Sequence, residues 1–167
     1  AHAHGGYIKM EMWPHLLALA REWEEGQSQV VLKARQLGIS WLLAAYALWT
    51  AQYQPAAVVL LLSQGEDEAK ELLDKARTIW THLPDDLKEL LAEDNKTNLR
   101  FQNGGLIIAL PATERAGRGY TATLVIPDEA AYHPYGAKNY GAYMPTLEAG
   151  GQLLMVSTAN GAFGHFN

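Results

Sequence analysis

Lys33-Ala34-Arg35-Gln36-Leu37-Gly38-Ile39-Ser40 joins a short apolar run, residues 30–32, to an apolar helical stretch over residues 40–53. A phosphate group at such a strand-to-helix turn meets several free backbone N–H groups at once. The usual phosphate loop has the pattern G-x-x-x-x-G-K-[S/T]. The second glycine and the hydroxyl are present here as Gly38 and Ser40, whereas Ile39 stands in place of the lysine. Lys33 stands in place of the first glycine, so the pattern is broken and the stretch is a candidate phosphate loop with a displaced lysine.

The displaced lysine still suits a phosphate site. A loop that curls around a phosphate brings its two ends together, so we expect Lys33 to supply the charge that Ile39 lacks. Arg35 adds a second cation, which can hold a γ-phosphate through two hydrogen bonds. The alternative is an ordinary turn with Ser40 as the N-cap of the helix. Two cations at a helix N-terminus favour a bound anion, because the helix dipole repels them.

A pair of acids ends another apolar run, residues 124–127. This run predicts a strand, and open α/β sheets bind ligands at the carboxyl ends of their strands. We expect Asp128 to hold Mg²⁺ and Glu129 to orient and deprotonate an attacking water. The alternative is a solvated helix start, where the dipole favours two acids. Pro127 has no N–H, so the strand must end or lose a ladder hydrogen bond there.

Apolar strands alternate with helices along the chain, which predicts an α/β fold with a mostly parallel central sheet flanked by helices. The turn Asn103-Gly104-Gly105 adds an antiparallel hairpin. A capping box over residues 63–66 is expected to start one helix. The predicted strands cover residues 30–32, 56–62, 98–101, 106–110, 123–126 and 153–156. The predicted helices cover residues 13–26, 40–53, 66–80 and 138–148, with a charged helical segment after Pro84.

The composition is that of one globular domain, with 167 residues, 49% of them hydrophobic and 19% charged. No apolar run reaches the roughly 20 residues of a membrane span. The absence of cysteine is consistent with a reducing compartment. A net charge of -5 excludes a broad surface that coats nucleic acid, so any DNA contact must be local. We interpret residues 1–6 as a flexible end or a cloning remnant and residues 7–167 as the domain.

A third polar block, Ser157-Thr158-Ala159-Asn160-Gly161, follows the strand predicted over residues 153–156 and is expected to touch the γ-phosphate or its water. With these three blocks the chain resembles, over residues 13–166, the ATPase domain of the large terminase subunit, the DNA-packaging motor of tailed bacteriophages. Residues 33–40 resemble the terminase phosphate loop, which in some members carries a lysine at its start. Residues 125–131 look like the family's acid motif, and residues 157–161 like its coupling motif.

The resemblance implies a P-loop NTPase of the ASCE or RecA-like type that hydrolyses ATP with Mg²⁺. It implies that hydrolysis moves double-stranded DNA into a procapsid, in the host cytoplasm at the procapsid portal. The implied partners are double-stranded DNA, the portal protein, the small terminase subunit and further copies of the chain in a ring. Large terminases carry a nuclease domain after the ATPase domain, and we expect none of its residues in this chain.

The resemblance also assigns roles to residues. Glu129, Arg35 and Arg118 would be catalytic, and Ser40 and Asp128 would bind the metal. Ser157, Thr158, Ala159 and Asn160 would couple hydrolysis to movement. Nucleotide would be bound by Lys33, Ala34, Arg35, Gln36, Leu37, Gly38, Ile39, Ser40, Trp13 and His15.

Two of these assignments have competing interpretations. Arg118, before the acid strand, either enters a neighbouring subunit's site in a ring or pairs with surface acids at a turn. Family members often have an adenine-reading glutamine where this chain has His15, and Trp13 beside it either stacks on the base or packs in the core, which we expect more. Two other functions stay open for the whole chain: a helicase-like ATPase, although such helicases keep the lysine beside the Ser or Thr, and a degenerate nucleotide-binding module without turnover.

Overall fold

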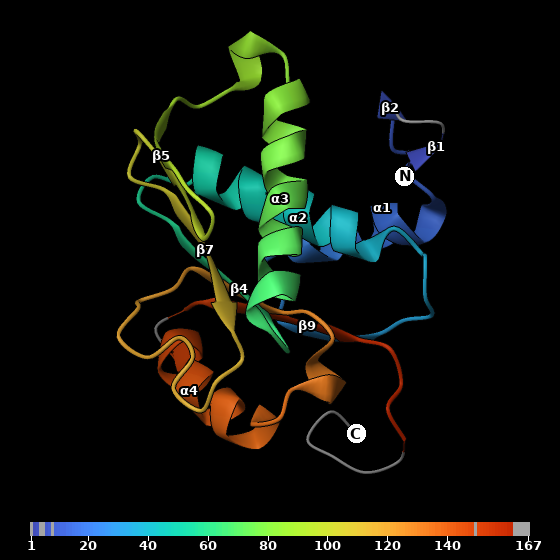
Figure 1. The fold of residues 1–167 in the computed structure, drawn as a ribbon, viewed down its shortest axis with the longest axis vertical. Helices are drawn as coiled ribbons and strands as arrows, with labels where there is room; N and C mark the ends of the chain where they lie inside the picture. Colours follow the sequence, from blue (N-terminus) through green and yellow to red (C-terminus); the bar gives the residue numbers. More distant parts are fainter. Residues whose placement is uncertain (1, 4–5, 8, 149, 162–167) are drawn as a thin grey trace.

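A seven-stranded sheet forms the centre of the computed structural model, which describes residues 2–3, 6–7, 9–148 and 150–161 (Figure 1). Its strand order is β3-β9-β8-β4-β7-β6-β5. The pairs from β3 to β7 are parallel, and β6 and β5 add to β7 as antiparallel strands. The predicted mostly parallel sheet with an added hairpin is therefore confirmed. The strands are β3 (Gln29–Leu32), β9 (Gln152–Ser157), β8 (Leu124–Pro127), β4 (Val58–Ser63), β7 (Leu106–Pro111), β6 (Asn98–Phe101) and β5 (Leu91–Asp94).

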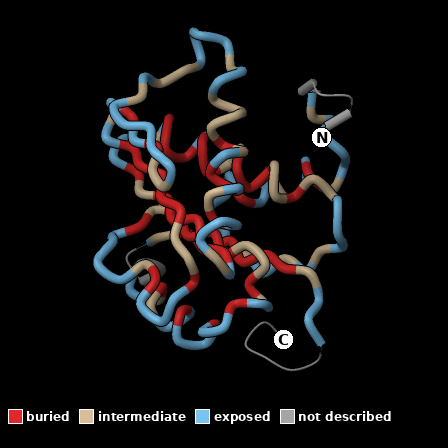
Figure 2. Tube along the Cα trace, in the orientation of Figure 1, coloured by how far each residue is buried: buried red, intermediate tan, exposed pale blue. Residues whose placement is uncertain are grey.

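Helices cover the sheet on both faces (Figure 1). One face packs against α1 (Pro14–Glu24), α2 (Ile39–Tyr53) and α3 (Glu66–His82), and the other packs against α4 (Gly136–Glu148) and the short 3₁₀ helix η2 (Ala130–Tyr132). Alternate residues of β4 enter the two cores: Leu61 packs with α2 and α3, and Leu60 packs with the α4 side. Strands buried on both faces read as continuous apolar runs, and Figure 2 shows this buried centre.

The segment after Pro84 is not the charged helix that the sequence predicts. It forms a short 3₁₀ helix, η1 (Asp85–Leu87), and then the edge strand β5. Two hydrogen bonds fix its path, because the Glu89 N–H donates to Gln52 Oε1 at 3.0 Å and the Gln102 N–H donates to the Leu90 carbonyl at 2.8 Å. Pairing with the free edge of β6 therefore overrides the local preference for a helix.

One further prediction about local structure needs correction. Ser63 is the buried last residue of β4, and the N-cap of α3 is Gly65, without a side-chain hydrogen bond. The predicted capping box is therefore wrong. Near the start of the chain, Ala3 pairs with Gly6 in a short antiparallel ladder of β1 (His2–Ala3) and β2 (Gly6–Tyr7). No helix in the described part of the chain has both the length and the apolar character needed to cross a membrane.

The hairpin between β6 and β7 approaches the end of α2 so closely that only glycine fits at position 105. A Cβ built on Gly105 would lie 1.9 Å from the carbonyl oxygen of Ala51. Asn103 holds this contact, because its side-chain amide donates to the carbonyls of Ala51 and Gln52 at 3.1 and 2.7 Å. The hairpin and α2 are thus joined by backbone contact.

We expect Gly105→Ala to lower the free energy of unfolding by on the order of 2 kcal/mol, because backbone must shift to make room. Gly141→Ala is the matched control, since Gly141 lies in α4 with nothing within 4 Å of its built Cβ. That change should raise the free energy of unfolding by about 0.5–1 kcal/mol. Urea unfolding measures both values, and equal midpoints for Gly105→Ala and the wild type would contradict the close approach.

Candidate active site

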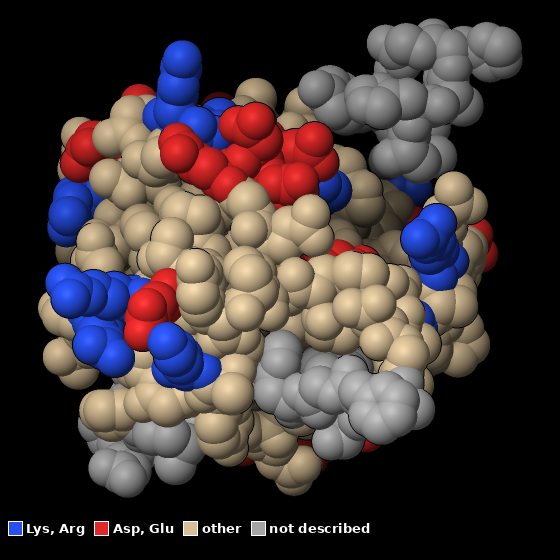
Figure 3. Space-filling model, turned by 60° about the horizontal axis from the view of Figure 1, so that its bottom comes forward, with Lys and Arg blue, Asp and Glu red and all other residues tan. Residues whose placement is uncertain are grey.

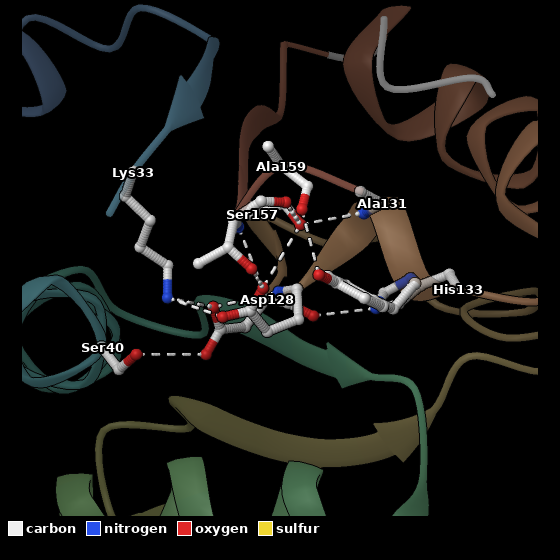
Figure 4. A network of polar contacts seen from close by, with 10 residues as sticks. Lys33, Ser40, Asp128, Ala131, His133, Ser157 and Ala159 are labelled. Carbon is white, nitrogen blue, oxygen red and sulfur yellow. Dashed lines mark hydrogen bonds and ion pairs between the residues drawn. The ribbon is translucent and has the colours of Figure 1, made fainter. Parts of the chain in front are cut away.

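Three neighbouring parallel strands bring the polar blocks of the sequence together (Figure 4). Lys33 follows β3, Ser157 ends β9, and Asp128 follows β8. The Lys33 N–H donates to the Ser157 carbonyl at 2.9 Å, and the backbone of Asp128 forms a parallel β-bridge with Val156. Parallel strands meet at one sheet edge with their carboxyl ends, which is where ligands bind in open α/β folds.

The phosphate loop leads from β3 into α2 through left-handed backbone. Gln36 has φ 63° and Gly38, the N-cap of α2, has φ 75°. The N-cap is therefore not Ser40, which was the alternative interpretation of this turn. Lys33 and residues 36–41 line a hollow at this turn. The first N–H groups of α2 begin beside that hollow, as an anion site at a helix N-terminus requires.

The displaced lysine reaches the two acids. The Lys33 ammonium lies 2.9 Å from Glu129 Oε1 and 3.7 Å from Asp128 Oδ1, and its side chain is only 9% exposed. On the other side of Asp128, the Ser40 hydroxyl donates to Oδ2 at 3.3 Å. The loop and the acid pair, which lie 88 residues apart in the sequence at Ser40 and Asp128, thus form one site.

Glu129 is held in a strained backbone conformation, with φ 51° and ψ 43°. A non-glycine residue in this region costs about 1–3 kcal/mol and persists where its surroundings hold it. Three donors hold the second carboxylate oxygen, Oε2: the Thr158 N–H and the Thr158 hydroxyl, both at 3.0 Å, and the Ser157 hydroxyl at 3.3 Å. The block after β9 therefore fixes the direction of the Glu129 carboxylate.

The two acids differ in their pKa. Burial raises the pKa of Asp128 above its usual range, with the Lys33 ammonium opposing this and the Glu129 charge adding to it. Burial alone would also raise the pKa of Glu129. The Thr158 N–H and the Lys33 ammonium outweigh burial there and lower that pKa. Glu129 is therefore stable as a carboxylate, whereas the charge on Asp128 needs a nearby cation.

Ser40 and Asp128 fit a magnesium ion. Mg²⁺ prefers hard oxygen ligands and usually takes one or two protein groups, filling its other positions with waters and phosphate oxygens. A hydroxyl and a carboxylate in direct contact beside a phosphate loop supply such a set. In the part of the chain that the structure describes, no three or more His, Cys, Asp or Glu side chains gather as a larger metal cluster.

The last two residues of the predicted coupling block bond to η2 instead of to the acids. The Tyr132 hydroxyl donates to the Ala159 carbonyl at 3.1 Å, and the Asn160 side-chain amide donates to the Ala131 carbonyl at 3.0 Å. Both partners belong to the 3₁₀ helix that follows Glu129 directly. The block therefore contacts Glu129 and the 3₁₀ helix that follows it.

The residues with competing interpretations lie at the edge of the site or outside it. Trp13 is 41% exposed, so the expectation that it packs in the core is wrong. Its ring centroid lies 5.6 Å from that of His15, whose Nε2 is 3.1 Å from the carbonyl oxygen of Leu37 in the phosphate loop. Arg35 is exposed on the phosphate loop.

Arg118 does not join the cluster around the acids. It is exposed in the segment between β7 and β8, which lies across the domain from the phosphate loop (Figure 1). There it acts on Glu114, whose pKa is lowered chiefly by the hydrogen bond from Lys138 and also by the Arg118 charge.

Sequence reasoning missed one residue of the site. His133 is buried, and its Nε2 lies 2.8 Å from the carbonyl oxygen of Asp128. This contact connects the end of η2 to the backbone of the first acid (Figure 4). The sequence carries no motif that predicts it, because the contact depends on the tight turn that the left-handed Glu129 begins.

A mostly parallel sheet with a phosphate loop after one strand and an acid pair after a nearby strand defines the class of P-loop NTPases. Residues 30–166 match the family model described as terminase large subunit, T4likevirus-type, N-terminal, so the chain belongs to that family.

Solved structures of phage packaging proteins share this fold. The large terminase ATPase domain of Thermus phage P74-26 superposes with a TM-score of 0.70 at 22% identity, covering 96% of this chain and 68% of that one. The HK97 bacteriophage large terminase gives a TM-score of 0.70 at 16% identity, covering 89% of this chain and 33% of that one. The N-terminal domain of the bacteriophage phi29 DNA packaging ATPase gives a TM-score of 0.61 at 15% identity, covering 88% of this chain and 81% of that one. At these identities the superpositions show the fold alone.

Neutralising the two acids should change stability in opposite directions at pH 7. Asp128→Asn should raise the free energy of unfolding, because the fold raises the pKa of Asp128 and so disfavours its charge. Glu129→Gln should lower it, because the fold lowers the pKa of Glu129 and so favours its charge. Urea unfolding at pH 7 measures both differences.

The pH dependence follows from the same signs. The gain from Asp128→Asn should shrink as the pH falls through the raised folded pKa, and it should vanish below the unfolded pKa, where both states are protonated. The loss from Glu129→Gln should shrink as the pH falls below the unfolded pKa through the lowered folded pKa. If both substitutions changed the free energy of unfolding in the same direction at pH 7, this description of the acid pair would be contradicted.

Proposed function

We propose that this chain is the motor domain of a large terminase, which hydrolyses ATP with Mg²⁺ to move double-stranded viral DNA into a procapsid. The observation that carries the proposal is the contact of Lys33 and Ser40 from the phosphate loop with Asp128 and Glu129. That contact supports a single site made of a phosphate-binding turn, two metal-ligand groups and a candidate base.

In the proposed nucleotide complex, the phosphates lie in the hollow lined by Lys33 and residues 36–41. The backbone N–H groups of residues 34–40 donate to them, and the side chains of Lys33 and Arg35 neutralise their charge. The adenine lies near the exposed ring of Trp13, beside His15. His15, which lies in α1, contacts the Leu37 carbonyl in the phosphate loop. Helix α1 therefore links the proposed adenine position to the phosphate loop.

In this proposal the two acids have different roles in hydrolysis. Ser40 and Asp128 hold the metal, which when bound neutralises charge on the β- and γ-phosphate oxygens. Glu129 accepts a hydrogen bond from the attacking water and takes its proton. Ser157 and Thr158 keep the Glu129 carboxylate directed, and any movement of that carboxylate passes through them to β9.

The partners that we propose follow from membership of the family. They are double-stranded DNA, the portal protein, the small terminase subunit and other copies of the chain in a ring, at the procapsid portal in the host cytoplasm. The DNA contact is local, because basic side chains on the face in Figure 3 form separate groups with acidic side chains among them. A net charge of -5 also gives the chain no general attraction to a phosphate backbone.

In such a ring we propose that Arg118 acts on the site of the neighbouring copy. It is exposed in the segment between β7 and β8, and that segment lies across the domain from the phosphate loop of its own chain (Figure 1). Head-to-tail contacts join different faces of successive copies, so they can bring this face to a neighbour's phosphate loop. Arginine residues supplied in trans are worth ~10³ to 10⁵ in rate.

Glu129→Gln tests the hydrolytic step. We expect nearly unchanged ATP binding and single-turnover hydrolysis slowed by at least about a hundredfold, as for the loss of a general base. Asp85→Asn, at an exposed acid that is also paired with a lysine, Lys88, is the matched control and should hydrolyse at the wild-type rate. Equal rates for Glu129→Gln and the wild type would remove Glu129 from the mechanism. A wild-type ring that binds ATP without turnover would instead indicate a degenerate nucleotide-binding module.

Mixed rings test the action of Arg118 in trans. Rings of Arg118→Ala copies and rings of Glu129→Gln copies should each be inactive. In a mixture, an Arg118→Ala copy keeps its Glu129 and receives the arginine of a Glu129→Gln neighbour. We therefore expect the ATPase rate of the mixture to exceed the sum of the separate rates, whereas a strictly additive rate would show that Arg118 does not act across the interface.

A further inference from the structure

We propose that Lys33 acts as an internal counter-ion that holds the acid pair until nucleotide binds, so that the site accepts a divalent metal only together with the nucleotide. The inference rests on the proposed function, because it takes Asp128 as a metal ligand. It adds a second role to the displaced lysine: the same ammonium that neutralises phosphate excludes metal from the acids beforehand.

The position of Lys33 supports this role. Its ammonium is bound by both acids, at 2.9 Å from Glu129 and 3.7 Å from Asp128, and its side chain is 9% exposed. Its backbone is fixed by the hydrogen bond to Ser157 at the end of the β3–β9 ladder. Any movement of the ammonium must therefore come from the side chain, which has four rotatable bonds.

A metal ion and this ammonium cannot both be held by Asp128. A bound Mg²⁺ lies about 2.0–2.1 Å from its oxygen ligands. The ammonium already lies 3.7 Å from one oxygen of this carboxylate, so a bound ion would share the carboxylate with a second positive charge, and two cations repel each other strongly in a partly buried site. The Asp128 side chain is only 14% exposed, so little water is available to screen that repulsion.

Nucleotide binding supplies a reason for the lysine to leave. Lys33 lines the hollow of the phosphate loop as well as contacting the acids, so phosphate oxygens and carboxylates compete for one ammonium. When it turns to the phosphates, Asp128 and Glu129 lose their counter-ion, and a divalent ion that arrives with the nucleotide replaces it. Because burial disfavours a lone charge on Asp128, the exchange of cations should be concerted.

Binding of Mn²⁺ in the absence of nucleotide tests the inference, with free ion counted by electron paramagnetic resonance. We expect no saturable site in the wild type and one site in Lys33→Met, at least about tenfold tighter than any wild-type binding, because the competing charge is gone. Lys33→Met combined with Asp128→Asn should lose that site. Lys70→Met is the matched control, since Lys70 also bridges two carboxylates, Glu66 and Asp67, but on the exposed surface of α3.

Three results would overturn the inference: a wild-type site that binds Mn²⁺ as tightly as the variant, no gain in folded Lys33→Met, or an equal gain in Lys70→Met. Lys33→Gln replaces Lys33→Met if the latter does not fold. The Mn²⁺ titration of the wild type can also overturn the inference by itself, if it shows tight binding without nucleotide. The titration needs no turnover. A wild type that hydrolyses ATP yet binds Mn²⁺ without nucleotide would refute this inference alone, whereas a wild-type ring that binds ATP without turnover would refute the proposed function.

Discussion

The ion pair between Lys33 and the acids connects the phosphate loop to the rest of the site. Asp128 and Glu129 are adjacent carboxylates, the first of them mostly buried, and such a pair is stable only beside a cation. The cation comes from the residue that opens the phosphate loop after β3, two strands away in the sheet. An anion in the loop and the charge state of the acids therefore depend on one another through a single side chain.

The sheet makes this interaction possible because it fixes both partners by backbone. Hydrogen bonds to neighbouring strands hold Lys33 and Asp128 at the carboxyl ends of β3 and β8. Left-handed backbone at Gln36, Gly38 and Glu129 then turns the loop and the second acid toward each other. Two of these three residues are not glycine, so the surrounding structure maintains strained backbone at the site, as it often does where geometry serves function.

The sequence predicted those parts of the molecule that depend on local pattern. Continuous apolar runs identified the buried parallel strands, and polar blocks at their ends identified the site. Loop closure predicted only that Lys33 lies near a phosphate in its own loop; its contacts with Asp128 and Glu129 were not predicted. Strand β5 was not predictable, because its pairing with β6 is a tertiary contact that opposes its charged composition.

The individual roles of side chains were harder to predict than their assembly. His133 reaches the backbone of Asp128 only because of the turn at Glu129, and no residue spacing in the sequence predicts such a turn. Trp13 had the pattern of a core residue, yet it lies on the rim of the phosphate loop with its ring partly exposed. Arg118 lies outside the site of its own chain, so the role proposed for it requires a second copy.

The most direct test of the account is a crystal structure of this chain with Mg²⁺ and a non-hydrolysable ATP analogue. The account predicts that the Lys33 ammonium donates to a phosphate oxygen and that Ser40 and Asp128 coordinate the metal. A structure with nucleotide in the loop but Lys33 still bound to Glu129, and with the phosphate charge neutralised by a different residue, would contradict it.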